Sequence, residues 1–546
     1  MYSLEITGQY VDLFHKRIFP ARIVVSDGII IEVQQIDGAP QQYLLPGFID
    51  AHVHIESAML TPAAFGRIAV THGTVATISD PHEIANVCGA EGVQYMIENS
   101  RHTPLKIFFG APSCVPATIF ENAGATLDVE AVAKLLRSED IWYLSEMMNY
   151  PGVLNRDTDV IAKIDAARNA GKPVDGHAPG LKGELAKVYA TAGITTDHEC
   201  YMLDEAIDKI NCGMHILIRE GSAAKNYEAL ASLLRTHPHK VMFCSDDKHP
   251  DELVLGHINR VVKRALNDGY DVYDVLRAAC INPAIHYKIP VGLLRIGDPA
   301  DFIVLSDLQQ PEVLQTYIKG QLVAERGKPL LPVTSPAVIN NFIAKEKQPD
   351  NFAIHTDLTD PVIRVIEAIE GQLITNELQL PGKAVNGQLV SDVANDILKI
   401  VVVNRYEEYA TPAVAFIKNF GLQRGAIAST VAHDCHNIIA VGTDDDSICA
   451  AVNSLIACKG GIAVAENADN VTTMPLPIGG IMSDKDAYET AAQYSLLDNK
   501  AKALGTPLKA PFMTLSFMAL LVIPSLKLSD KGLFDGSRFS FTDVIV

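Results

Sequence analysis

Two imidazoles separated by a single residue are the first feature of this sequence that could do chemistry. His52 and His54 lie in the apolar run GFIDAHVH. Side chains alternate in direction along a β-strand, so both rings would project from one face, where they could ligate the same metal ion. Such a pair is also often incidental or structural, so its interpretation depends on the rest of the chain.

Four further candidate ligands follow at the ends of later apolar runs. Glu146 is an acid inside WYLSEMM, and buried carboxylates persist mainly when they are paired or bound to a metal. His177 in DGHAPG and His198 in TTDHEC supply imidazoles suited to a second divalent ion, bridged to the first through Glu146. Asp246 in FCSDDKHPDE could ligate the first ion and accept a proton from a nucleophilic water. Either histidine alone could be a hydrogen-bonded core residue, but the whole set predicts a two-metal hydrolase.

Other polar residues could support this centre. Asp80, His82 and Glu83 form a compact cluster that could bind an extra metal or orient the main site, although Asp80 could equally cap the following helix. Asp247 is the alternative to Asp246 as metal ligand and proton acceptor. Strand alternation predicts that the Asp247 side chain faces outward and only supports the ligands. A further cluster, His433, Asp434 and His436, resembles a ligand set but lies far along the chain. Packing and hydrogen bonding are our default interpretation for it, with a lid or subunit contact as the alternative.

Residues so far apart need a scaffold that brings strand ends together. Eight apolar, strand-like runs alternate with segments of helical periodicity between residues 46 and 289. They are 47–54, 74–80, 105–111, 142–148, 173–178, 194–200, 214–220 and 241–247. Eight such units predict an α/β fold of the (β/α)8 TIM-like barrel type, in which catalytic groups stand at the C-terminal strand ends. Nearly all the candidate residues fall there.

Two further regions flank the predicted barrel. Residues 1–45 alternate as short strands, with Asp27-Gly28 as a two-residue hairpin turn, and residues 290–335 return to short strands. We expect these two segments to form a small β-sandwich together. Residues 345–546 are long enough to form a separate C-terminal α/β domain.

Composition narrows the choice of partners and compartment. The 546 residues carry a net charge of −20, which repels phosphate backbones and anionic lipid headgroups, so neither nucleic acid nor membrane is an expected partner. The nine cysteines are scattered and never form a C-x-x-C pair, which favours reduced thiols in the cytoplasm. No export signal is visible at the N-terminus, and the apolar run 512–523 is too short to span a bilayer. We expect that run to be core.

The order of these candidate ligands along the chain resembles that of the amidohydrolase superfamily. The superfamily pattern is an H-x-H pair on the first strand, a ligand on the fourth, histidines on the fifth and sixth and an aspartate on the eighth. Many members carry a carbamylated lysine on the fourth strand, whereas this strand offers Glu146 and no lysine. Longer motifs resemble the bacterial adenine deaminase family over nearly the whole chain. They are PGFIDAHVHIESAM (46–59), ISDPHEIANVCG (78–89), SEMMNYPGV (145–153), DGHAPGL (175–181), TDHE (196–199), REGSAAKN (219–226), CSDDKHPDEL (244–253), AHDCHNIIAVG (432–442), PLPIGGIMS (475–483) and MTLSFMALLVIPSLKLSDKGLFD (513–535).

This resemblance implies purine salvage by hydrolysis of adenine at C6, giving hypoxanthine and ammonia. It implies two divalent metal ions per chain, manganese or iron rather than zinc, and a homo-oligomer, with a dimer favoured. Two ions can lower the pKa of a bound water towards about 7, and a carboxylic acid should protonate a ring nitrogen as C6 is attacked. Glu83 and Glu220 are both candidates for that acid. Arg219, Ser222 and Asn226 are weaker candidates for purine contacts, and Ser222 could instead cap a helix.

Two other functions stay open at this stage. A cyclic amide or N-acetyl hydrolase could use the same barrel, although Glu146 in place of a lysine argues against the cyclic amidases. A non-catalytic scaffold is the third hypothesis. Loss of several ligands would indicate a scaffold, and none of the six is lost.

Overall fold

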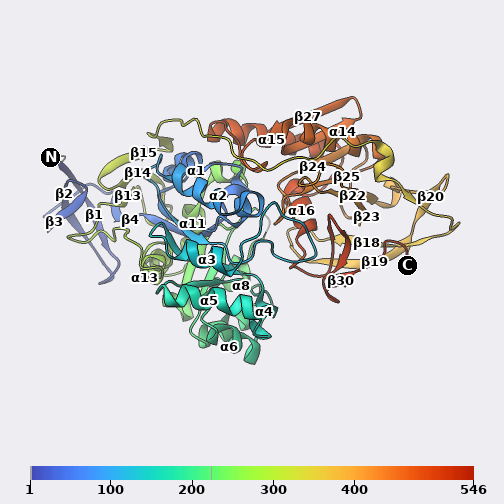
Figure 1. The fold of residues 1–546 in the computed structure, drawn as a ribbon. Coiled ribbons are helices and arrows are strands. Elements are labelled where there is room, and N and C mark those ends of the chain that lie inside the picture. Colours follow the sequence, from blue (N-terminus) through green and yellow to red (C-terminus); the bar gives the residue numbers. More distant parts are fainter. Residues whose placement is uncertain (1–2, 223) are drawn as a thin grey trace.

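A computed structural model describes residues 3–222 and 224–546 of the chain. A barrel of eight parallel strands lies at the centre of the molecule (Figure 1). Five strands are hydrogen-bonded in the order β5-β6-β7-β8-β9 and three in the order β10-β11-β12. The strands are β5 (Phe48–Val53), β6 (Thr74–Ser79), β7 (Lys106–Ala111), β8 (Ile141–Met147), β9 (Val174–Gly176), β10 (Thr196–Asp197), β11 (His215–Arg219) and β12 (Val241–Cys244).

Backbone contacts close the barrel at the two seams between these sheets. The Thr195 N–H donates to the Val174 carbonyl at 2.9 Å, which joins β9 to the segment before β10. At the other seam the Asp246 N–H donates to the His52 carbonyl at 2.9 Å, beside a parallel bridge between Val53 and Asp246. The predicted barrel is therefore confirmed, and each predicted strand run overlaps one of its strands.

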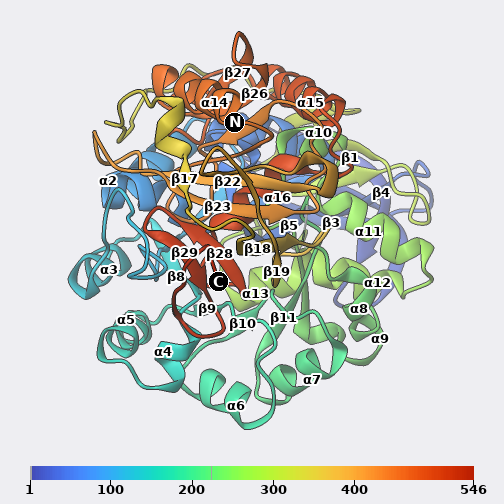
Figure 2. The same cartoon turned by 90° about the vertical axis from the view of Figure 1, so that its right-hand side faces the viewer.

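Helices cover the outside of the barrel, and Figure 2 shows them in an arc around the strands. They are α1 (Pro62–Ala69), α2 (His82–Ser100), α3 (Val129–Leu136), α4 (Tyr150–Leu154), α5 (Thr158–Asn169), α6 (Gly183–Thr191), α7 (Leu203–Asn211), α8 (Tyr227–Leu230), α9 (Leu233–Thr236), α10 (Pro250–Leu255), α11 (Ile258–Asn267), α12 (Val272–Leu276) and α13 (Asn282–His286). Every residue of strands β5 and β6 is buried, because a parallel barrel strand is covered on both faces.

The two segments that flank the barrel in sequence, predicted as residues 1–45 and 290–335, together form one eight-stranded sheet. Its strand order is β16-β15-β14-β13-β4-β1-β2-β3. The strands are β1 (Ser3–Asp12), β2 (Arg17–Ser26), β3 (Ile29–Gln35), β4 (Tyr43–Pro46), β13 (Phe302–Leu305), β14 (Val313–Ile318), β15 (Gln321–Glu325) and β16 (Lys328–Pro329). The predicted sandwich is thus one continuous sheet, with an apolar core of its own that includes Ile23 and Phe302. At the predicted hairpin turn, Asp27 and Gly28 both have positive φ, 48° and 81°, as a type I′ turn requires.

The C-terminal region is built on a second eight-stranded sheet, in the order β19-β18-β23-β22-β25-β24-β26-β27. The strands are β18 (Val362–Ala368), β19 (Thr375–Pro381), β22 (Ile397–Val403), β23 (Ala413–Lys418), β24 (Ala426–Ser429), β25 (Ile438–Gly442), β26 (Gly461–Asn467) and β27 (Asn470–Pro475). The remaining elements are β17 (Ile354–His355), β20 (Lys383–Val385), β21 (Gln388–Val390), α14 (Asp445–Cys458), α15 (Ala487–Ala503), α16 (Pro511–Ser516), β28 (Leu526–Ser529), β29 (Gly532–Asp535) and β30 (Ser540–Phe541).

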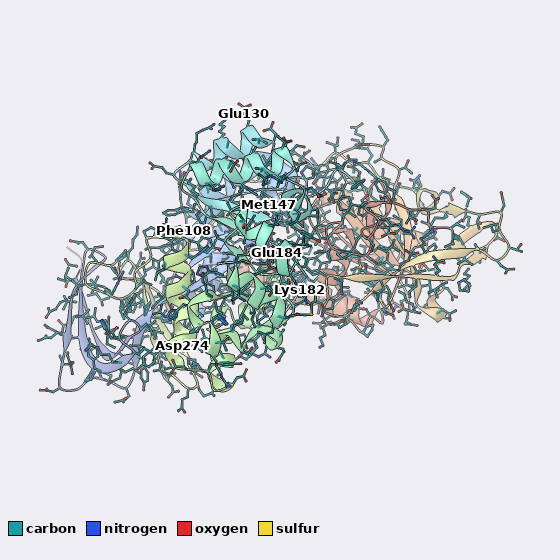
Figure 3. All side chains as sticks on the ribbon, turned by 90° about the horizontal axis from the view of Figure 1, so that it is seen from below. Phe108, Glu130, Met147, Lys182, Glu184 and Asp274 are labelled. Carbon is teal, nitrogen blue, oxygen red and sulfur yellow. The ribbon has the colours of Figure 1, made fainter. Side chains whose placement is uncertain are left out.

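This C-terminal region packs directly on the barrel. Helix α15 lies against α10 and α1, where the buried Tyr494 hydroxyl hydrogen-bonds to the His249 ring. One continuous apolar core extends from the barrel strands into the C-terminal sheet. In Figure 3, Met147 at the end of β8 lies nearer to the C-terminal region than Phe108 in β7 does, so the C-terminal strand ends face this region.

The apolar run 512–523 lies in this interface rather than in a membrane segment. It forms α16 and the 3-10 helix Phe517–Ala519, and nearly all of its side chains are buried, as expected for core. Among the described residues, no helix is both long and apolar enough to cross a bilayer.

Candidate metal centre

The six predicted ligands converge at the C-terminal ends of the barrel strands. His52 belongs to β5 and Glu146 to β8, while the others follow their strands within one or two residues. All six side chains are buried, with at most 6 % of any residue exposed. The six are His52, His54, Glu146, His177, His198 and Asp246.

His52, His54 and Asp246 form one group of donors. The Nε2 atoms of the two rings are 3.1 Å apart, and both face Asp246 Oδ1, at 3.5 Å from His52 and 3.2 Å from His54. The other ring nitrogen of His54, Nδ1, lies 3.2 Å from the Asp80 carbonyl, a contact that orients the ring. The lone pairs of three side chains therefore point at one small volume.

Glu146 joins this group to a second one. Its Oε2 lies 2.9 Å from His177 Nδ1 and 3.0 Å from His198 Nε2, while its Oε1 lies 3.5 Å from His54 Nε2. Burial alone would raise the pKa of Glu146, but the His177 and His198 rings hold it well below its usual range. One ionised carboxylate thus reaches both sets of imidazoles.

These spacings fit divalent ions. Two ligand atoms about 2.1 Å from one ion, at angles of roughly 90–110°, lie about 3.0–3.4 Å apart. The distances among the donors of both groups fall near this range. Buried imidazoles and carboxylates packed this closely repel or compete for protons unless a cation lies between them. The residues present therefore fit two divalent ions, with Glu146 shared.

A buried arginine network supports the centre, and sequence reasoning missed one of its members. The Arg219 guanidinium pairs with both Glu199 and Asp246, and its Nη1 lies 2.6 Å from Asp246 Oδ2. Glu199 Oε1 also lies 3.5 Å from His198 Nε2 and 3.7 Å from His177 Nδ1. The sequence did contain a signal for Glu199, because this acid directly follows the predicted ligand His198 in the motif TDHE. Arg219 orients the ligands and does not line the pocket around them.

The cluster after β6 lies beside the centre. Asp80 Oδ1 accepts the N–H of His82, the first residue of α2, at 3.1 Å, and its Oδ2 lies 3.1 Å from His82 Nδ1. The His82 ring also faces three other carboxylates, with Nδ1 3.4 Å from Glu146 and Nε2 3.5 Å from Glu83 and 3.6 Å from Asp434. Glu83 accepts hydrogen bonds from His433 Nδ1 and His436 Nε2 of the C-terminal region.

The charges around Glu83 favour its ionised form. Burial would raise the pKa of Glu83, but the His433, His436 and His82 rings hold it well below its usual range. Burial likewise disfavours charge on His433, yet the Glu83 and Asp247 carboxylates raise its pKa to about 9. The contact is therefore a buried ion pair between the barrel and the C-terminal region.

The pocket over the centre is closed by the C-terminal region. Its barrel side carries every predicted ligand except His52, together with His82, Glu83, Glu199 and Asp247. Its other side is Leu373, His433, Asp434, Phe517 and Leu520. Sequence reasoning treated His433, Asp434 and His436 as packing by default, but the first two line this pocket and His436 holds Glu83.

Other predicted residues lie elsewhere. Glu220 follows the last residue of β11, faces away from the ligands and pairs with Arg264 at 3.4 Å, so it does not line this pocket. Ser222 hydrogen-bonds to Glu252, and the Asn226 amide donates to the His198 and Cys200 carbonyls, so neither is placed to contact a substrate.

The expectation that Asp247 faces outward is wrong. It lines the pocket beside Asp246 and accepts a hydrogen bond from the Ser57 hydroxyl at 2.5 Å. The reason is that β12 ends at Cys244 and Asp246 has a left-handed φ of 54°, so strand alternation no longer applies there.

A parallel barrel with histidine and carboxylate donors at its C-terminal strand ends defines the amidohydrolase class of metal-dependent hydrolases, and the Amidohydrolase family model matches residues 43–323. A second model, the adenine deaminase C-terminal domain, matches residues 372–540. The chain belongs to the adenine deaminase family.

Curated relatives match this chain from end to end. An adenine deaminase of Salinibacter ruber is 52% identical over 545 residues, which cover 100% of this chain and 99% of the relative. An adenine deaminase of a Sulfurovum species is also 52% identical, over 99% of both chains. One from Methanosarcina barkeri is 51% identical over 98% of both.

Proposed function

We propose that this chain hydrolyses adenine at C6 to hypoxanthine and ammonia, as an enzyme of purine salvage, with two divalent metal ions. The observation that carries the proposal is the position of Glu146, whose two oxygens reach both imidazole groups inside a pocket closed by the C-terminal region. Family membership over the whole chain supports the choice of adenine.

The ligands divide between the two ions as their contacts suggest. His52, His54 and Asp246 would hold the first ion, His177 and His198 the second, and Glu146 both. Mixed imidazole and carboxylate donors suit manganese(II) or iron(II). When bound, the ions act as Lewis acids that make a water molecule acidic enough to deprotonate near neutral pH.

The protein's own groups would then move the protons. Asp246 accepts a proton from the attacking water, since it faces the first group of ligands and is held in place by Arg219. Glu83 lines the pocket and delivers a proton to the purine ring nitrogen beside C6. Because His433 and His436 favour the ionised carboxylate, Glu83 must take up that proton within the catalytic cycle before it can donate it. The two protons of the attacking water balance the reaction: one reaches the ring nitrogen through Glu83, and the other passes through Asp246 to the amine. The C6–N bond then breaks, the amine leaves as ammonia and the C6 carbonyl forms.

Substrate size follows from the closure of the pocket. Leu373, Phe517 and Leu520 offer apolar contacts to a flat purine, and together with the barrel they leave little room for a ribose. The cytoplasmic location and the homodimer remain predictions from the sequence.

A substrate screen of the manganese-loaded protein tests this proposal. We expect hypoxanthine and ammonia from adenine, much lower kcat/KM for adenosine, and no turnover of guanine, cytosine or dihydropyrimidines. Turnover of a cyclic amide without turnover of adenine would reject the assignment in favour of the alternative hydrolase. Comparable efficiency on adenine and adenosine would reject the size argument.

A further inference from the structure

A second cavity lies outside the metal centre and shares no lining residue with it. It has a volume of about 250 Å3 and lies beside β11, β12, α10 and α11. At about 30 Å3 for each water molecule, it could hold roughly eight waters, so it is larger than a single small ion requires.

The lining of this cavity has an excess of positive charge. It includes Lys225, Lys248, Arg260 and Arg264 but only two carboxylates, Glu220 and Glu252. The whole chain carries a net charge of −20, so a cavity lined by four cationic side chains is opposite in sign to the chain as a whole. Like charges held close together are unfavourable unless an anion compensates them.

The carboxylates satisfy only part of these cations. Arg264 pairs with Glu220 and also with Glu228, which lies outside the lining. The Glu252 carboxylate accepts a hydrogen bond from Ser222 and is a distant partner of Lys248. Among the described residues, neither Lys225 nor Arg260 has an ion-pair partner.

Lys248 is the most informative of the four. Its side chain is only 8 % exposed, yet within the described part of the chain its ammonium meets just the Glu220 carbonyl at 3.4 Å and the Glu252 carboxylate at 3.9 Å. A buried ammonium has three donors and normally fills them with close partners. Ser245 and His257, which also line the cavity, cannot supply these partners for Lys248, because both are already hydrogen-bonded to Asp50.

We infer that this cavity is a binding site for a phosphate-type anion, either free inorganic phosphate or the phosphoryl group of a small metabolite. Lys248 contacts the anion from inside the cavity, and Lys225 and Arg260 contact it from the exposed side. A phosphoryl group supplies the several acceptor oxygens that these donors lack. The inference does not rest on the proposed deaminase activity.

Isothermal titration of the metal-loaded full chain at constant ionic strength tests this site, with inorganic phosphate and ribose 5-phosphate as separate probes. We expect saturable binding of at least one probe, weakened about tenfold or more in Arg260→Ala and in Lys225→Ala. Tighter binding of ribose 5-phosphate would identify a phosphorylated metabolite as the ligand, and tighter binding of phosphate would identify the free ion.

Lys263→Ala is the matched control, because Lys263 lies on the same helix, α11, but does not line the cavity. This variant should bind like the unaltered protein. Equal affinities in the Arg260, Lys225 and Lys263 variants would place the anion elsewhere, for example on the metal ions, and would overturn the inference. So would the absence of any binding at millimolar concentrations.

Discussion

Glu83 of the barrel and His433 of the C-terminal region are 350 residues apart in the chain, yet they form a buried hydrogen bond beside the candidate metal centre. His436 holds the other oxygen of the same carboxylate. The C-terminal domain therefore contributes directly to the geometry of the pocket, and this explains why the barrel alone would be an incomplete site.

The first prediction concerns this contact. His433→Ala should lower kcat by about 10–100-fold, the usual effect of removing a group that orients an active-site residue, while both metal ions stay bound. The acidic limb of the pH–rate profile should shift to higher pH, because loss of a cationic neighbour raises the pKa of Glu83. His355→Ala, an exposed histidine of the same region, is the control. An unchanged kcat and pH profile in the His433 variant would contradict the role we give to this contact.

The two candidate acids can be separated by matched substitutions. Glu83→Gln should reduce kcat by roughly 10²–10⁴-fold, as expected for lost acid–base catalysis, with little change in metal content. Glu220→Gln should leave kcat within about twofold, because Glu220 lies at the other cavity and pairs with Arg264. Steady-state rates with the opposite pattern would remove Glu83 from the mechanism.

Asp246 and Asp247 should differ in metal binding. Asp246→Asn should weaken binding of the first metal ion and reduce turnover by about 10²–10⁴-fold, because this carboxylate faces both His52 and His54. Asp247→Asn should keep both ions, since Asp247 contacts Ser57 rather than those histidines, and any loss should appear in kcat. Elemental analysis that found metal loss only in the Asp247 variant would exchange the two roles.

Stability should depend on a buried lysine behind the second ligand group. Lys209 Nζ contacts Asp197 at 3.0 Å, Glu205 at 2.8 Å and the Ala178 carbonyl at 2.7 Å. Lys209→Met leaves buried carboxylates unpaired, so the free energy of unfolding should fall by about 3–5 kcal/mol. Lys182→Met, which removes a surface lysine that pairs with Asp204, should leave the free energy of unfolding nearly unchanged, because solvent screens that ion pair.

The pH dependence of that stability has a defined sign. Burial would raise the pKa of Asp197, but Lys209 holds it below its usual value. The pair therefore stabilises the fold fully above the unfolded pKa of about 3.9, and the contribution is lost as the pH falls through the lower folded value. Denaturant midpoints measured from pH 7 down to pH 3 should show this acid loss in the unaltered protein and less of it in Lys209→Met. Equal midpoints for the two proteins at pH 7 would contradict the prediction.

The sequence was sufficient for features that depend on local periodicity. The eight strand runs alternate with helical segments, and residues such as His177 and His198 lie at the C-terminal ends of those runs, so both the barrel and the converging donors could be predicted. Register beyond a strand end could not be predicted. The left-handed φ of Asp246 turns Asp247 into the pocket, while Glu220 continues outward from β11.

Contacts across domains were also beyond prediction. Nothing in the spacing of AHDCHNIIAVG indicates that His433 and His436 meet Glu83, because no periodic pattern relates segments separated by 350 residues. Only the packing of the C-terminal sheet and α15 on the barrel brings them together.

The most direct test of the account is reconstitution of the metal-free protein with manganese(II), with adenine turnover followed at each addition. We predict that activity is absent in the metal-free protein, rises with added metal and saturates at two ions per chain, and that His177→Ala binds only one ion tightly and stays inactive. Full adenine turnover without metal, or saturation at one ion with unimpaired activity in the His177 variant, would contradict a two-metal centre bridged by Glu146.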